Sequence, residues 1–284
     1  MRSIWILARM TFQEAVRRRI VLTGLVLGLL FLLVFSIGIR MISTEIARET
    51  TLEGGAAYQN IMRTEMSNFL LMAGLYAVTF LSVAMGALLG ADTLAGEINS
   101  GSIQTILTKP IRRSDVVFGK WLGFAGLLGL YALLMSGGVV LMVFLQSDYV
   151  PRNMWTGLPL IYLESLVVMT ISLAGSSAMP ALATGGMVFG LYGLAFLGGW
   201  IEQIGALANY PSAIKIGIVT SLVIPTEALW RRAAFEMQTP LASAIGISPF
   251  GAFSVPSILM VLYAILYLVV TLLTAVNIFK QRDI

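Results

Sequence analysis

The side chains that most often carry covalent chemistry or bind metals are missing from this sequence. It has no cysteine and no histidine among its 284 residues, which removes thiol nucleophiles, imidazole bases and the commonest ligands of zinc, copper and haem. Its 15 methionines are spread along the chain, as expected of packing side chains. We therefore expect no catalytic residue, no metal site and no cofactor bound by this chain.

A polar segment at residues 91–120 holds seven of the 32 charged residues and lies between two long apolar runs. Within it, either Ser100 or Gly101 can cap the start of a helix, and Lys109-Pro110 ends that helix. Its apolar residues recur at helical spacing: Ile103, Ile106 and Leu107. We predict a short helix that connects two spans and whose apolar stripe docks into a groove of a soluble protein. The alternative is that it lies flat at the membrane interface.

Charged residues flank this short helix. Glu97 is a candidate contact for a basic residue of a partner; the alternatives are a local ion pair with Lys109 or Arg113, or a solvated carboxylate. On the other side, Ser114 is expected to cap the next helix, with Asp115 in its first turn, where the helix dipole favours a negative charge.

The composition identifies the surrounding chain as an integral membrane protein. Hydrophobic residues make up 58% of the sequence and charged residues only 11%, with a mean hydropathy of +0.89, whereas soluble domains carry about 25% charged residues. So few charges cannot cover a surface that faces water. The formal charge of +4 fits Lys and Arg retained on the cytoplasmic side better than nucleic-acid binding.

About 20 apolar residues are needed to cross the hydrocarbon core as a helix. Six segments qualify, which predicts an all-α polytopic fold with a single transmembrane domain over residues 1–284. The predicted spans are 20–39, 69–90, 121–145, 158–179, 181–201 and 257–279. The fourth and fifth are separated at Pro180, within an apolar run that is too long for one span.

An even number of spans places both termini on one side, and basic residues choose that side. Eleven of the 18 basic residues fall in residues 1–19, 91–120 and 280–284. We therefore predict a multi-pass protein of the cytoplasmic (inner) membrane, with both termini and the polar segment cytoplasmic. If residues 3–16 form a helix, one of its faces is mostly polar and another mostly apolar. This pattern predicts a weakly amphipathic helix at the cytoplasmic interface.

The segment 202–256 is the least regular. Its apolar stretch Ile214–Ile224 is too short to cross, and it ends at Pro225, before a stretch with Glu227 and Arg231 at i, i+4 spacing. Either a short re-entrant or surface hairpin on the external side or a loop packed over the bundle accounts for this pattern.

Glu164 is the acidic residue that lies well inside a predicted span. An intramembrane carboxylate is a candidate contact for a substrate or a proton; alternatively it reaches the external interface, or its span starts later. Glycines four residues apart allow close helix approach, either within the chain or at a dimer seam. These pairs are Gly24/Gly28, Gly86/Gly90, Gly119/Gly123 and Gly186/Gly190.

The order of motifs in the polar segment resembles that of permease subunits of ATP-binding-cassette (ABC) transporters of the exporter-like type 2 class. Those permeases carry an A-G-E-x-x-x-G-T-like stretch, a short leucine-rich helix, a proline and an arginine, in that order. The matching residues are Ala95, Gly96, Glu97, Gly101, Ile103, Leu107, Pro110, Arg113 and Lys120. Ser102 stands where the family usually has threonine. More loosely, the likeness includes the N-terminal helix, the six spans and the tail 278–283.

The resemblance implies a permease that pairs as a homodimer or heterodimer in membrane lipid and binds two copies of a separate ABC ATPase, which holds ATP and magnesium. A cytoplasmic coupling helix at Ile103–Leu107 would sit in a cleft of that ATPase. The chain itself lacks a G-x-x-x-x-G-K-[ST] phosphate loop, so we expect a non-catalytic subunit. The alternatives are a secondary transporter, which works without an ATPase, and an intramembrane enzyme, for which a nucleophile and base are hard to assemble here.

Overall fold

The computed structural model describes residues 2–53, 56–99, 112–245, 250 and 254–282, and these residues form helices with no strand among them. The helices are α1 (Arg2–Val16), α2 (Arg19–Glu53), α3 (Ala56–Ala91), α4 (Thr93–Asn99), α6 (Arg113–Ser147), α7 (Met154–Ala178), α8 (Ala181–Leu207), α9 (Pro211–Val223), α10 (Thr226–Met237), α11 (Pro240–Ile245) and α12 (Ile258–Gln281). Among the described helices, α2, α3, α6, α7, α8 and α12 are long and apolar enough to cross a membrane. This confirms the predicted all-α fold with six spans.

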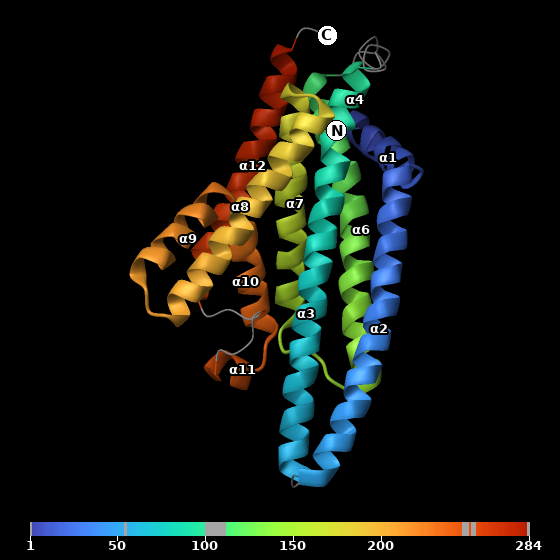
Figure 1. The fold of residues 1–284 in the computed structure, drawn as a ribbon. Coiled ribbons are helices and arrows are strands. Elements are labelled where there is room, and N and C mark those ends of the chain that lie inside the picture. The colour runs from blue at the N-terminus through green and yellow to red at the C-terminus, as the bar shows by residue number, and fades with distance from the viewer. Residues whose placement is uncertain (1, 54–55, 100–111, 246–249, 251–253, 283–284) are drawn as a thin grey trace.

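Helix α7 is the centre of the bundle (Figure 1). It packs against α3, α10 and α12, and more lightly against α6, α8 and α4. In its most apolar window 67% of residues are buried, against 17% for α2 and 22% for α12. The outer spans therefore present most of their surface to lipid, while α7 is enclosed by protein.

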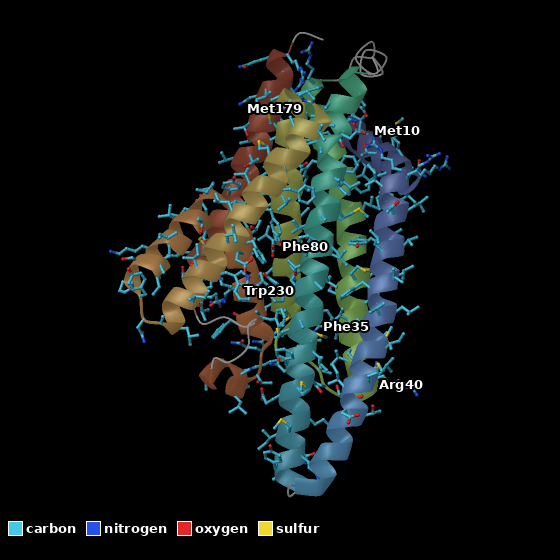
Figure 2. All side chains as sticks on the ribbon, viewed as in Figure 1. Met10, Phe35, Arg40, Phe80, Met179 and Trp230 are labelled. Atoms are coloured by element: carbon cyan, nitrogen blue, oxygen red, sulfur yellow. The ribbon has the colours of Figure 1, made fainter. Side chains whose placement is uncertain are left out.

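Helices α2 and α3 run on well past the predicted ends of their spans. They contain 35 and 36 residues, or about 52 Å of helix each at 1.5 Å per residue, whereas the hydrocarbon core is about 30 Å thick. The predicted first span ended at residue 39, yet the helix continues through exposed Arg40 to Glu53 (Figure 2). The two helices form a hairpin that projects beyond the rest of the bundle (Figure 1). Hydropathy predicts where a helix leaves the lipid, but the helix can continue beyond that point into water.

For residues 202–256 the sequence allowed two interpretations, a hairpin or a packed loop. In the structure this segment contains three further helices, α9, α10 and α11. The fifth span extends to Leu207, and α9 and α10 follow, bent by 108° at the break around Pro225. Helix α9 packs along α8, and α10 packs against α7. Trp230 of α10 is 2% exposed and its ring lies 4.9 Å from that of Tyr76 on α3 (Figure 2). Helix α10 is therefore packed into the core of the bundle, whereas most residues of α9 are exposed.

The start of α6 differs from the sequence prediction. The N-cap is Arg112 and the helix begins at Arg113, so Ser114 lies inside the first turn and its predicted capping role is wrong. The amide N of Asp115 donates to the Arg112 carbonyl oxygen at 2.9 Å, so the helix begins two residues earlier than it would with Ser114 as the cap. Asp115 does lie in the first turn, as predicted.

Candidate functional site

Helix α1, helix α4 and the end of α12 lie at one end of the bundle (Figure 1). We call this the basic end, because the chain segments there carry Arg17 and Arg18 between α1 and α2, Arg113 at the start of α6, and Lys280 and Arg282 at the end of α12. The segment predicted to couple to a partner joins α4 to α6 at this end. The predicted site residues Ser100, Gly101, Ile103, Ile106, Leu107 and Pro110 lie outside the described residues, whereas Glu97 and Arg113 flank them.

Glu97 of α4 forms an ion pair with Lys120 of α6. The two side chains are only 14% and 6% exposed, respectively. Lys120 lies seven residues into α6, so this contact ties the helix that precedes the coupling segment to the one that follows it. Lys120 is a partner that the spacing of residues did not suggest, since Lys109 and Arg113 are nearer in sequence.

Arg113 holds the end of the last helix instead. Its Nη1 donates to the carbonyl oxygens of Lys280 at 3.1 Å and Arg282 at 2.7 Å. The side chain of Arg282 in turn donates to the carbonyl oxygen of Ser177, at the end of α7, at 2.7 Å. The starts and ends of α6, α7 and α12 are thereby linked at the basic end.

A small apolar cluster lies beneath these polar contacts and includes Leu94 of α4. The other members come from three spans: Val116 and Val117 of α6, Leu173 of α7, and Leu272, Ala275, Val276 and Phe279 of α12. Leu94, Val116, Val117 and Phe279 are fully buried. Helix α4 is therefore held to α6 by an ion pair, and it packs in one apolar cluster with residues of α6, α7 and α12.

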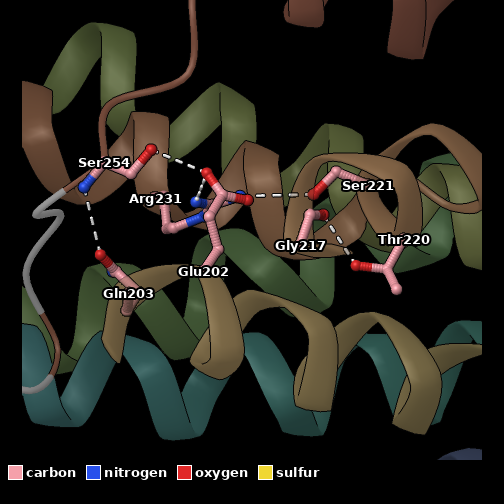
Figure 3. Close-up of polar contacts among 7 residues, drawn as sticks. All are labelled: Glu202, Gln203, Gly217, Thr220, Ser221, Arg231 and Ser254. Carbon is pink, nitrogen blue, oxygen red and sulfur yellow. Dashed lines mark hydrogen bonds and ion pairs between the residues drawn. The ribbon is translucent and has the colours of Figure 1, made fainter. Parts of the chain in front are cut away.

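A second polar cluster is buried between α8, α9 and α10 (Figure 3). Arg231 Nη1 lies 2.6 Å from Glu202 Oε1, and Arg231 Nη2 donates to Glu202 Oε2 at 2.9 Å and to Ser221 Oγ at 3.3 Å. The Ser254 hydroxyl donates to Glu202 Oε1 at 2.7 Å, and the Ser254 amide donates to Gln203 Oε1 at 3.2 Å. The Arg231 and Glu202 side chains are 1% and 4% exposed.

Glycines bring the backbones of α8 and α9 close enough for this cluster to form. A Cβ atom on Gly217 would lie 2.2 Å from Glu202 Cβ and 2.7 Å from the Gly198 carbonyl oxygen. On α8, a Cβ atom on Gly199 would lie 2.1 Å from Glu227 Cγ. No other residue type fits these contacts without displacing a helix.

Glu164 lies in the middle of α7 and is fully buried. Within the described part of the chain, neither of its carboxylate oxygens has a hydrogen-bond partner. Glu227 of α10 acts on it electrostatically, and Glu164 acts in turn on Tyr76 of α3 and Tyr192 of α8. The structure thus places this predicted residue among three other helices, and its role remains a prediction.

The Glu202–Arg231 pair was not predicted, although the sequence carries two signals for it. Glu202 directly follows an apolar run, and Arg231 lies on what was predicted to be the external side, where basic residues are less common. Each signal indicates a charged side chain that requires an oppositely charged partner within the protein. In the described part of the chain, no group of three or more His, Cys, Asp or Glu side chains is arranged to hold a metal ion.

Comparison with known proteins agrees with this architecture. The description "ABC-2 family transporter protein" applies to a sequence profile that matches residues 5–284. The chain is similar to the probable ABC transporter permease protein NosY of Stutzerimonas stutzeri, with 26% identity across 99% of both chains. It is also similar to the protein of that name from Pseudomonas aeruginosa, with 29% identity over 49% of this chain and 45% of the relative.

A match over nearly the whole length shows the class: this is a multi-pass membrane subunit of an ABC transporter. The chain belongs to the ABC-2 transporter family. In such a transporter the permease subunit is the non-catalytic membrane component.

Proposed function

We propose that this chain forms the translocation pathway of an ATP-driven exporter and is driven by a separate ABC ATPase bound at the basic end. The observation that carries the proposal is the contact between α4, which precedes the coupling segment, and α6, which follows it. Glu97 pairs with Lys120 across the segment, and Leu94 packs with residues of α6, α7 and α12. A push on residues 100–111 would therefore reach three spans at once.

In this mechanism the ATPase supplies the chemistry. ATP and magnesium bind to the ATPase subunits, whose closure moves the coupling residues Ser100, Gly101, Ile103, Ile106, Leu107 and Pro110. Glu97 and Arg113, at the two ends of the segment, transmit the movement to α6 and to the end of α12. The spans then tilt, and the pathway opens to the other side of the membrane. The resemblance to exporter-like permeases supports export as the direction.

A second permease copy completes the pathway in this proposal. Helix α8 offers a face for it, because Cβ atoms on Gly185, Gly186, Gly190 and Gly193 would meet nothing within 4 Å. The other predicted glycine pairs are occupied within the chain; Gly86, for example, would meet the Ser165 carbonyl oxygen at 2.9 Å. The open glycines support a homodimer, or a heterodimer with a related permease, that is seated along α8 in the lipid.

The orientation of the chain follows from its charge. With the basic end in the cytoplasm, both termini and the coupling segment face the ATPase, and the α2–α3 hairpin projects to the other side (Figure 1). The protein would then reside in the cytoplasmic membrane. On this orientation Glu164 lies on the route of the transported solute and contacts it when the bundle opens.

The test is site-specific photo-crosslinking from Ile103 and Leu107 in native membranes. A crosslinker at either position should capture an ABC ATPase, whereas one at exposed Leu182 of α8, outside the coupling segment, should not. Crosslinks that reach only lipid or this chain would contradict the proposal. A purified chain that transports without any ATPase would favour the alternative, a secondary transporter.

A further inference from the structure

Acidic groups outnumber basic ones in the buried region where α7, α8 and α10 meet. Glu164, Glu202 and Glu227 are 0%, 3% and 5% exposed. The buried cations of the described residues are Lys120, which pairs with Glu97, and Arg231, which pairs with Glu202. Three buried carboxylates in this region therefore face one buried cation, Arg231, which pairs with Glu202 and also acts electrostatically on Glu227.

Glu164 is the more demanding of the two, because both of its carboxylate oxygens are buried and have no hydrogen-bond partner among the described residues. An ionised carboxylate in that state loses its hydration without gaining a hydrogen bond or an ion pair, which costs free energy. Such a group therefore binds a positive charge. A buried polar atom without a partner is also uncommon in natural proteins and calls for an explanation. A bound proton supplies the charge directly.

The surroundings of Glu164 offer one interacting carboxylate and no free cation. On α10, Glu227 interacts electrostatically with Glu164, whereas Arg231, one turn further along, is paired with Glu202. On α3 and α8, the interacting groups are the neutral phenols of Tyr76 and Tyr192.

The remaining elements packed on α7 hold their titratable groups in other contacts. Tyr131 of α6 donates to the Gly24 carbonyl oxygen, Tyr263 of α12 donates to that of Leu222, and Glu97 of α4 pairs with Lys120. Tyr267 of α12 interacts with Tyr263. Glu227 is thus the ionisable group whose charge bears most directly on Glu164.

The two carboxyl groups belong to different helices, so a movement of α10 relative to α7 would separate them. Glu164 lies on the central helix α7, whereas Glu227 lies one residue past the start of α10, beside the 108° break from α9. Glu227 also rests against Gly199 of α8. A rotation of α10 about that break would move Glu227 relative to Glu164 and admit water between them.

We propose that Glu164 and Glu227 form a proton-binding site inside the transmembrane domain, which holds a proton in this conformation and releases it when α10 moves away from α7. The proposal deepens the role proposed above for Glu164, and it rests on that role only for its use during transport. Release is a simple dissociation: the O–H bond of the acid breaks, leaving a carboxylate and a hydrated proton. Because the charge of Glu227 acts on Glu164, ionisation of one carboxyl group disfavours ionisation of the other, and the two titrate as a coupled unit.

The test is infrared spectroscopy of the purified full-length chain in lipid nanodiscs across a pH series. The carbonyl stretching band of a protonated carboxylic acid should be present near neutral pH and should vanish in Glu164→Gln. In Glu227→Gln the band should persist, but its dependence on pH should change, because the interacting carboxylate is gone. Glu236→Gln removes a carboxylate from the same helix outside the buried cluster, and it should leave the band unchanged.

Two outcomes would overturn the proposal. One is a spectrum that contains no such band, or one that Glu164→Gln and Glu227→Gln both leave unaltered. The other is loss of the band at fixed pH with sodium or potassium chloride but not with choline chloride, which would assign the site to a metal cation. The measurement needs no ATPase, so its failure is distinguishable from failure of the coupling proposal, which the crosslinks test separately.

Discussion

Arg231 on α10 and Glu202 on α8 contact each other through the two Nη nitrogens of the guanidinium group and both carboxylate oxygens, at 2.6 and 2.9 Å. Their side chains are 1% and 4% exposed, and Ser221 and Ser254 occupy further hydrogen-bonding positions around them. The pair joins a spanning helix to the bent helices α9 and α10. Because both charges are enclosed, the contact is costly to break from either side.

We expect Arg231→Met to lower the free energy of unfolding by about 3–5 kcal/mol, because it leaves Glu202 as an uncompensated buried charge. The double variant Glu202→Met/Arg231→Met should lose less, since it removes both charges. Unfolding in detergent, followed by circular dichroism, measures both.

The matched control for this pair is Glu236→Gln. Glu236 pairs with Arg232 on the same helix, where the side chains are 18% and 23% exposed, so we expect a loss below about 1 kcal/mol. Equal losses for Arg231→Met and Glu236→Gln would refute a stabilising role for the buried pair.

The six spans were predictable because lipid imposes a minimum apolar length that the sequence displays openly. Hydropathy could not predict which charged side chains are paired inside the protein. The predicted fifth span stopped at residue 201, directly before Glu202, because a carboxylate signals the end of a lipid-facing run. The helix in fact continues to Leu207, since Arg231, 29 residues later, neutralises that carboxylate within the protein.

The glycine pairs show the same limit. Their four-residue spacing is identical in every case, yet Gly24 and Gly28 meet methionine side chains of α3 and α6, while Gly186 and Gly190 meet nothing within 4 Å. Spacing indicates that a helix can be approached closely, but the neighbour is determined by the three-dimensional packing. The resemblance in the polar segment predicted the family, which is confirmed, whereas the coupling residues themselves stay a prediction.

The Glu97–Lys120 pair predicts a coupling defect that charge exchange repairs. Glu97→Lys should weaken transport while the permease still assembles, because two like charges would force α4 away from α6 at the coupling segment. The exchanged variant Glu97→Lys/Lys120→Glu should recover transport, since the pair is restored with its charges reversed. Transport and ATP hydrolysis of the assembled complex are measured together. A single variant that transports as well as the unaltered complex would show that this contact does not transmit movement.

The close approach of α8 and α9 predicts that a single methyl group is harmful at Gly217. Gly217→Ala places its Cβ 2.2 Å from Glu202 Cβ and 2.7 Å from a backbone oxygen of α8, so we expect a loss of about 1–3 kcal/mol from overpacking. The control is Gly193→Ala on α8, where nothing lies within 4 Å. Alanine there should be neutral or stabilise by up to about 1 kcal/mol through its helix propensity. Thermal unfolding of the two variants side by side distinguishes a packed glycine from an open one.

The open face of α8 predicts where a second copy binds. Gly190→Leu should leave the single chain folded, because no atom lies within 4 Å of the added Cβ, but it should block close approach of another helix. We expect association in lipid bilayers to weaken at least about tenfold, which corresponds to about 1.4 kcal/mol, as measured by single-molecule photobleaching across a range of protein densities. Gly137→Leu is the matched control, since Gly137 on α6 is also exposed and free of neighbours. Dimers disrupted by Gly137→Leu and tolerant of Gly190→Leu would move the seam from α8 to α6.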